Sequence, residues 1–152
     1  DGWQLMIAHP PCTHLAVSGA RYFKKKVNRQ RKALEFFLAL LNALVPMVCV
    51  ENPVSVVSTR IRKADQIIQP WMFGHGHMKT TCLWLKNLPR LESTNIVFGR
   101  ESIILKESPS ADRWKNRSRT YEGIAEAMAN QWGSLDSSYR DGFGFDFKDR
   151  LK

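Results

Sequence analysis

The chain has 152 residues, of which 43% are hydrophobic and 24% are charged, and these proportions are typical of a globular protein with one domain. Its longest apolar stretch, within residues 33–45, contains Glu35 and Asn42 and is too short to span a bilayer. The formal net charge of +9 means that the surface is on balance basic and not acidic. A basic surface attracts polyanions, so the charge indicates a polyanionic partner. The alternative is a basic surface that only faces water.

The three cysteines are too few for a disulfide framework. Cys49 and Cys82 lie inside apolar runs, so we expect free thiols in a reducing compartment. The start of the chain has no basic segment followed by an apolar one, which predicts that no secretory signal is present. Together these features predict a cytoplasmic protein without a membrane partner.

The first predicted element is a short buried strand at Leu5–Ala8, which a polar and basic loop follows. Apolar residues then recur at helical spacing over residues 28–45, and Pro46 ends this helix. A second buried strand covers residues 47–50. A strand, a crossover helix and a strand in this order predict a right-handed βαβ unit with parallel strands.

Residues 54–79 show no clear period, and residues 80–85 read as a third strand. Residues 95–98 and 102–105 are expected to form either a hairpin or the two arms of a loop. A final helix is predicted over residues 121–132, with Thr120 as its N-cap and Gly133 as its C-terminal stop. The tail beyond it is either a frayed end or a short docked strand.

Chemically useful residues follow both of the first two strands. Pro10, Pro11 and Cys12 form a stiff loop that carries a thiol, while Glu51 and Asn52 follow the second strand. Ligands of open α/β sheets bind beyond the carboxyl ends of the strands, so these groups predict covalent catalysis at one sheet edge. The alternatives are a packed cysteine that acts as a small hydrophobe, and a glutamate that caps a helix or forms an ion pair.

The basic residues gather in three segments, 21–32, 60–63 and 113–119, where they would neutralise phosphates. Those that we assign to nucleic-acid binding are Lys24, Lys25, Lys26, Arg117 and Arg119. Two groups of residues contain side chains of the kinds that bind zinc: His75, His77 and Cys82 in one, and His9, Cys12 and His14 in the other. Neither has the paired Cys-x-x-Cys spacing of a zinc site, so we predict no metal.

The motifs resemble those of one enzyme family. Pro10-Pro11-Cys12 resembles the catalytic Pro-Cys loop of C5-cytosine DNA methyltransferases, and Glu51-Asn52 is similar to their Glu-Asn-Val motif, with Pro53 in the third position. Arg60-Ile61-Arg62 is similar to the Arg-x-Arg element of the family, and residues 123–129 are similar to its closing helix beside the cofactor. The overall style looks most like the small phage and prophage members.

The resemblance implies roles for individual residues. Cys12 would attack C6 of a cytosine that is flipped out of the DNA, and Glu51 would contact the N3 side of the ring. Arg60 or Arg62 would hold the base or an adjacent phosphate, and S-adenosylmethionine would supply the methyl group. The residues that would contact the substrate are Pro10, Pro11, Asn52 and Lys79.

The resemblance also implies an α/β fold, a partial Rossmann-like methyltransferase sheet with mainly parallel strands and flanking helices. In the family, a glycine-rich cofactor loop precedes the Pro-Cys strand, whereas this chain begins four residues before that strand. We therefore expect an N-terminally truncated catalytic domain over residues 1–135 and a tail over residues 136–152. A second chain would then supply the missing strands.

Two other functions stay open. One is a non-catalytic basic module that binds nucleic acid or a protein partner. The other is a methyltransferase of the same fold that acts on an exocyclic amine, although such enzymes usually carry an aromatic residue where Cys12 stands.

Overall fold

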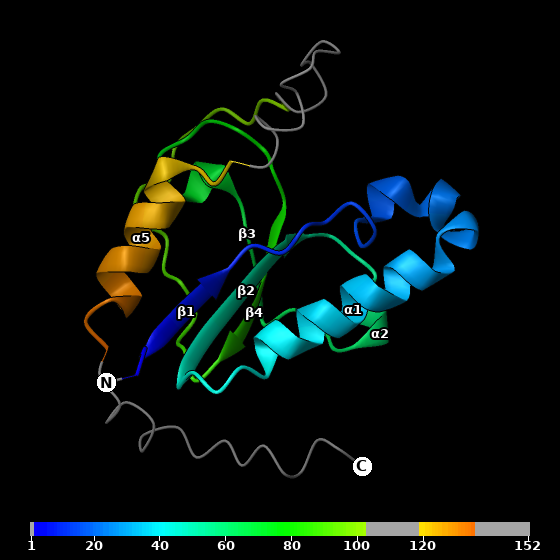
Figure 1. Ribbon diagram of the computed structural model, residues 1–152. Helices are drawn as coiled ribbons and strands as arrows, with labels where there is room; N and C mark the ends of the chain where they lie inside the picture. Colours follow the sequence, from blue (N-terminus) through cyan, green and yellow to red (C-terminus); the bar gives the residue numbers. More distant parts are fainter. Residues whose placement is uncertain (1, 103–118, 136–152) are drawn as a thin grey trace.

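A four-stranded sheet lies at the centre of the chain, with a helix on each face (Figure 1). The computed structural model describes residues 2–102 and 119–135. The strands stand in the order β1-β2-β4-β3 and cover Leu5–Ala8 (β1), Met47–Pro53 (β2), Gln66–Ile68 (β3) and Thr81–Lys86 (β4). The α-helices are Val27–Leu41 (α1), Val57–Arg60 (α2) and Glu122–Trp132 (α5), and two 3₁₀-helices cover Val17–Lys25 (η1) and Pro70–Met72 (η2).

The predicted βαβ unit is confirmed, since β1 and β2 are parallel neighbours joined through α1. Their register runs from Leu5 opposite Met47 to Ala8 opposite Val50. Helix α1 ends at Leu41, four residues earlier than predicted, and Asn42 caps it by donating its N–H to the Leu38 carbonyl. Pro46 disfavours helical geometry at the residue before it, and the chain turns into β2 from there.

The expectation of mainly parallel strands is wrong, because only the β1–β2 pair is parallel among the described strands. Strand β4 is antiparallel to both β2 and β3 and lies between them. Residues 69–80, which join β3 to β4, contain η2 and loops but no crossover α-helix, so β4 returns beside β3 in the opposite direction. Strands β1, β2 and β3 therefore all point the same way.

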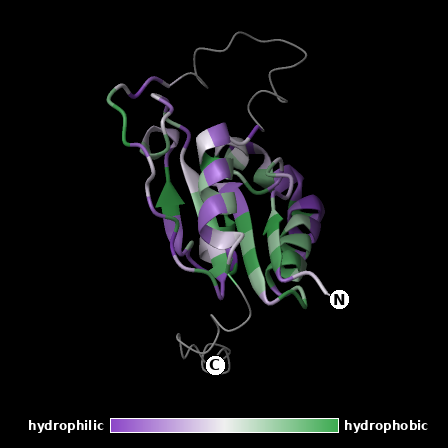
Figure 2. Cartoon of the chain, turned by 90° about the vertical axis from the view of Figure 1, so that its left-hand side faces the viewer, coloured by the Kyte–Doolittle hydropathy of each residue, from purple (hydrophilic) through white to green (hydrophobic). Residues whose placement is uncertain are grey.

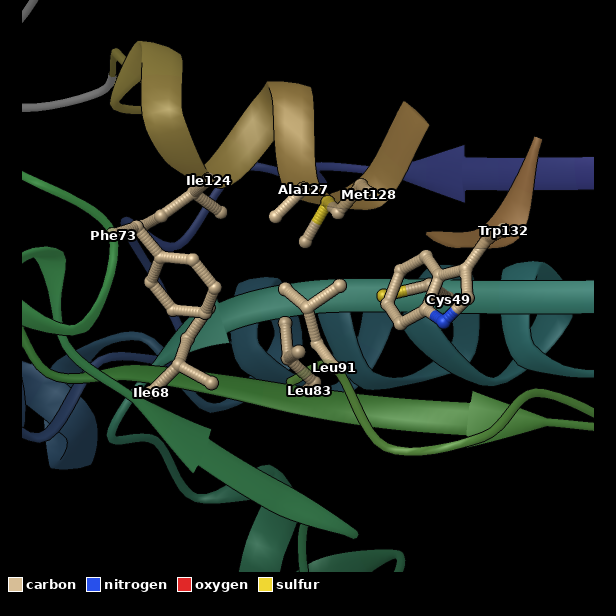
Figure 3. Packing of buried hydrophobic residues seen from close by; sticks show 9 residues of the cluster. All are labelled: Cys49, Ile68, Phe73, Leu83, Leu91, Ile124, Ala127, Met128 and Trp132. Carbon is tan, nitrogen blue, oxygen red and sulfur yellow. The ribbon is translucent and has the colours of Figure 1, made fainter. Parts of the chain in front are cut away.

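Alternation along the central strands builds two cores. Val48 and Val50 face α1, and Cys49 faces α5. The core on the α1 side also contains Leu15, Phe37, Leu41, Val57, Cys82 and Trp84. Figure 3 shows the core on the α5 side, which consists of Cys49, Ile68, Phe73, Leu83, Leu91, Ile124, Ala127, Met128 and Trp132. The central strands β2 and β4 are thus buried over most of their length, whereas β1, which was expected to be buried, is half-buried at the edge of the sheet.

Helix α5 confirms the final predicted helix, and Gly133 is its C-cap as expected. The N-cap is Tyr121 rather than Thr120, because Tyr121 is the last residue with extended backbone geometry. Seen from the α5 side, the outward face of this helix is largely hydrophilic and the strands behind it are hydrophobic (Figure 2). The solvent-facing side of α5 thus shows no apolar stripe.

The region 95–102, which was expected to belong to either a hairpin or a loop with two arms, forms none of the described strands. It runs beside the loop after β3 instead, with isolated parallel bridges from Phe73 to Asn95 and from His77 to Glu101. Residues 103–105 and the tail from 136 lie outside the described residues.

Candidate functional site

Two hydrogen bonds join the segment that follows β1 to the end of β2. Since Ala8 lies opposite Val50, the next residue of each strand, His9 and Glu51, comes to the same edge of the sheet. His9 Nδ1 lies 3.1 Å from Glu51 Oε2. The Glu51 side chain is 17% exposed and that of His9 is 42% exposed, so the pair is open to solvent from the His9 side.

Asn52 provides the second link. Its Nδ2 donates to the Pro10 carbonyl oxygen over 3.1 Å, and both residues are buried. Its Oδ1 is buried and has no hydrogen-bond partner among the described residues. A buried polar side chain that makes one long-range hydrogen bond holds the two segments in one arrangement.

The two loops stay together beyond this point. Ala16 and Ser55 form an antiparallel bridge, in which the Val17 N–H donates to the Val54 carbonyl and the Val56 N–H donates to the Leu15 carbonyl. The segment that carries the thiol is therefore fixed at both ends against the segment that carries Glu51 and Asn52.

Cys12 lies in a tight turn within this fixed segment. Its carbonyl accepts hydrogen bonds from the N–H groups of Leu15 and Ala16 over 2.9 and 2.8 Å. Cys12 is half-buried, whereas Cys49 and Cys82 are buried in β2 and β4. Burial raises the pKa of both buried thiols, and the negative charge of Glu51 adds to this effect. Cys12 is thus the thiol that a reactant can reach.

The arginines of the Arg-x-Arg element are placed differently from Cys12 and Glu51. Arg60 is exposed at the end of α2. The Arg62 guanidinium lies 2.6 Å from Asp65 Oδ2, and it donates to the Leu85 carbonyl oxygen over 2.9 Å.

The position of Leu85 shows how far Arg62 is from the loops. Thr81 of β4 stands opposite Pro53 at the carboxyl edge, and Leu85 is four residues further along β4, about 13 Å away at the usual rise of a strand. The structure therefore does not bring Arg62 to the ends of β1 and β2.

Lys79 precedes β4 and so lies at the carboxyl edge. Its backbone N–H donates to Gln69 Oε1 over 3.0 Å, and its Nζ donates to the Arg119 carbonyl over 2.7 Å. The same ammonium group lies 5.9 Å from the ring centre of Tyr121. These contacts tie the start of α5 to the loop before β4.

The lysines assigned to nucleic acid occupy the junction of η1 and α1. Lys24 and Lys25 are exposed, and the Lys26 ammonium lies 5.4 Å from the ring centre of Tyr22. Arg119 is exposed just before α5, and Arg117 lies outside the described residues. The lysines follow the Cys12 loop directly along the chain.

Sequence reasoning assigned no role to His9 toward Glu51. The parallel pairing of the two predicted strands could have indicated the contact. Ala8 lies opposite Val50, so His9 and Glu51, the next residue of each segment, come to the same edge of the sheet. The sequence pattern groups His9 with Cys12 and His14 instead. Among the described residues, no group of three or more His, Cys, Asp or Glu side chains is arranged to hold a metal ion.

The chain matches no protein-family model, no curated protein and no solved structure. Within residues 2–102 and 119–135, every helix is too short or too polar for a membrane span.

Proposed function

We propose that this chain carries the cytosine-activating part of a C5-cytosine DNA methyltransferase, with Cys12 as nucleophile and Glu51 as acid. The observation that carries the proposal is the hydrogen bond from Asn52 to the Pro10 carbonyl, since it fixes the Pro-Pro-Cys loop against the Glu-Asn segment. A nucleophile and an acid must keep a fixed spacing to act on the same ring.

The proposed reaction begins with a cytosine flipped out of DNA. The Cys12 thiolate forms a bond from Sγ to C6, and the electrons of the C5–C6 double bond move toward C5. Glu51 donates a proton at N3 and so offsets the negative charge that develops in the ring. C5 then acts as a nucleophile and takes up a proton from water. A solvent base removes the original C5 hydrogen, the Cys12 thiolate leaves C6, and the N3 proton returns to Glu51, which restores the aromatic base.

The resemblance implies S-adenosylmethionine, which supplies a methyl group to C5 when it is bound. The described residues do not fit this cofactor, because no glycine-rich turn leads from a strand into a helix. The two glycines with positive φ, Gly74 and Gly99, lie in the loops after η2 and before residue 102. The proposal for these residues therefore ends at activation of the base.

The second part of the proposal concerns partners. The basic residues of the η1–α1 junction would contact DNA phosphates, consistent with the net charge of +9. Among the described residues, β1 pairs with β2 alone, so its outer edge offers unpaired backbone groups. A strand of a second chain, or of a longer form of this one, would pair there and bring the cofactor site.

Exchange of the cytosine C5 hydrogen tests the proposal without a cofactor. Addition of Cys12 lets C5 take up deuterium from heavy water, and elimination then leaves deuterated cytosine. The native chain should deuterate C5 of a cytosine-containing oligonucleotide, as measured by mass spectrometry, while C12S should not. E51Q should slow the exchange about 100-fold or more, the scale of general acid catalysis. The control E35Q changes an exposed carboxylate on α1 and should leave the rate unchanged.

The alternative is a basic module that binds nucleic acid without chemistry, which the net charge favours. It predicts salt-dependent DNA binding by the native chain with no exchange above background, and this result would refute our proposal. An enzyme that acts on an exocyclic amine would also leave C5 unexchanged, because only attack at C6 activates that carbon.

A further inference from the structure

A hollow of about 290 Å³ lies beside the Pro-Pro-Cys loop, between this loop and α1. Its walls are Pro11, His14, Arg29, Lys32, Ala33 and Phe36. None of these residues forms the hydrogen bonds that join residues 9–17 to residues 51–56, so the hollow is separate from the His9–Glu51 pair. Its volume is at the low end for ligand sites, which suits one nucleotide rather than a long stretch of chain.

The wall formed by α1 combines positive charge with an exposed aromatic ring. Arg29, Lys32 and Phe36 recur at helical spacing and so share one face of α1. Phe36 is 52% exposed, although its neighbour Phe37 is fully buried in the core. Within residues 2–102 and 119–135, neither Arg29 nor Lys32 forms an ion pair, whereas Arg31 lies 3.9 Å from Glu35. Two cations without an ion pair among the described residues, beside an exposed aromatic ring, match a phosphate joined to a flat base.

The opposite wall is held in place. Gln30 of α1 donates from Nε2 to the His14 carbonyl over 3.2 Å, which joins the helix to the loop. The turn after Cys12 fixes the same loop internally through its Leu15 and Ala16 hydrogen bonds. Ala33 also lines the hollow and contributes only a methyl group to its wall. The loop and α1 on the two sides of the hollow are therefore held together before any ligand arrives, which reduces the ordering cost of binding.

We propose that this hollow binds one unstacked nucleotide of a nucleic-acid strand, with its base against Phe36 and its phosphate between Arg29 and Lys32. That the bound strand is the substrate DNA rests on the proposed function, and in that case the nucleotide is a neighbour of the target cytosine. Bases stack on aromatic side chains without sequence preference, so the site would position the strand and would not read its sequence.

Binding to oligothymidylate tests the site separately from the chemistry, because this strand contains no cytosine. The measurement is fluorescence anisotropy with a labelled 12-mer of thymidylate and with a 12-mer of abasic deoxyribose phosphate, each titrated at several salt concentrations. The variant F36L keeps the apolar bulk and removes the ring. R29A/K32A removes both cations, and R90A/R100A removes two exposed cations beyond β4 that lie outside the three basic segments.

F36L should weaken binding of the thymidylate strand about 5- to 150-fold and leave the abasic strand unchanged. R29A/K32A should weaken both strands and lower the slope of log Kd against log salt by about 1.4, whereas R90A/R100A should leave the slope unchanged. Equal losses for the two strands with F36L, or equal slopes for the two double variants, would overturn the proposal. Competition by free thymidine monophosphate as effective as by the strand would also overturn it, since the ligand would then be a free nucleotide.

These results are separate from the hydrogen-exchange test. If the hollow does not bind the strand, the native chain still exchanges C5 of cytosine. If Cys12 does not act on cytosine, the F36L and R29A/K32A effects on thymidylate persist. Circular dichroism of each variant shows whether the fold is retained. Arg29, Lys32 and Phe36 are exposed, so we expect F36L and R29A/K32A to keep the fold.

Discussion

Replacement of Asn52 by alanine is the most direct test of how the two loops are held together. Asn52 is 1% exposed, and its Nδ2 donates to the carbonyl of the buried residue Pro10. N52A removes this donor and leaves the carbonyl without a partner, which costs about 1–3 kcal/mol. The same change removes the unpartnered Oδ1, which offsets part of the loss. We expect a net decrease in the free energy of unfolding of about 1–2 kcal/mol.

Ser55 provides a matched control. It is 3% exposed and lies three residues further along, but its Oγ has no hydrogen-bond partner among the described residues. S55A should therefore change the free energy of unfolding by less than about 0.5 kcal/mol. Because the two substitutions affect equally buried positions of one segment, their difference isolates the hydrogen bond to Pro10.

Thermal unfolding followed by circular dichroism measures both variants. For a chain of this length, about 1 kcal/mol corresponds to about 2–4 °C, so Tm of N52A should fall by about 2–8 °C. The half-buried Cys12 should also react faster with a maleimide in N52A, because its loop has lost one anchor. An N52A variant as stable as S55A, with unchanged thiol reactivity, would refute the idea that Asn52 fixes the loop.

Three further predictions follow from burial and close approach. Brief treatment of the folded protein with iodoacetamide should add one adduct by intact mass, at Cys12, and two or more adducts would contradict the burial of the other thiols. Burial raises the pKa of the Cys49 thiol in the fold, so the free energy of unfolding should fall as pH rises above about 9, the ordinary pKa of a thiol. Urea unfolding measures this dependence, and C49A should lessen the slope of the free energy against pH by up to about 1.4 kcal/mol per pH unit. G123A should cost about 1–3 kcal/mol in the same assay, because a Cβ there would collide with the Phe73 carbonyl, while G19A has room and should be neutral; equal effects of the two would contradict this packing.

The sequence was most informative where structure depends on neighbours along the chain. Strand β1 occupies the residues predicted, since a run of four apolar residues between polar ones is typical of a short strand. Strand β2 continues three residues beyond its predicted end, through Pro53. Glutamate, asparagine and proline are poor strand formers, and they are extended here because β4 pairs with them from the other side. That pairing depends on a strand about 30 residues away.

The candidate site divides in the same way. The meeting of the Cys12 loop with Glu51 followed from one βαβ unit, and the parallel pairing of β1 and β2 confirms the adjacency on which it depended. The place of Arg62 did not follow, because its partners Asp65 and Leu85 come together only when β4 is inserted between β2 and β3. An arginine read from a local motif gives no sign of such a long-range contact.

The position of α5 late in the chain has a consequence for synthesis of the protein. The core on the α1 side can close once β4 has been made, since its members end at Trp84. The other core waits for Trp132, which follows the end of β4 by 46 residues. At ordinary translation rates this delay is about 2–9 s, during which Leu83 and its neighbours remain uncovered on the ribosome. The nascent chain is thus a half-covered sheet for seconds, and this interval is when it is most exposed to chaperones and to aggregation.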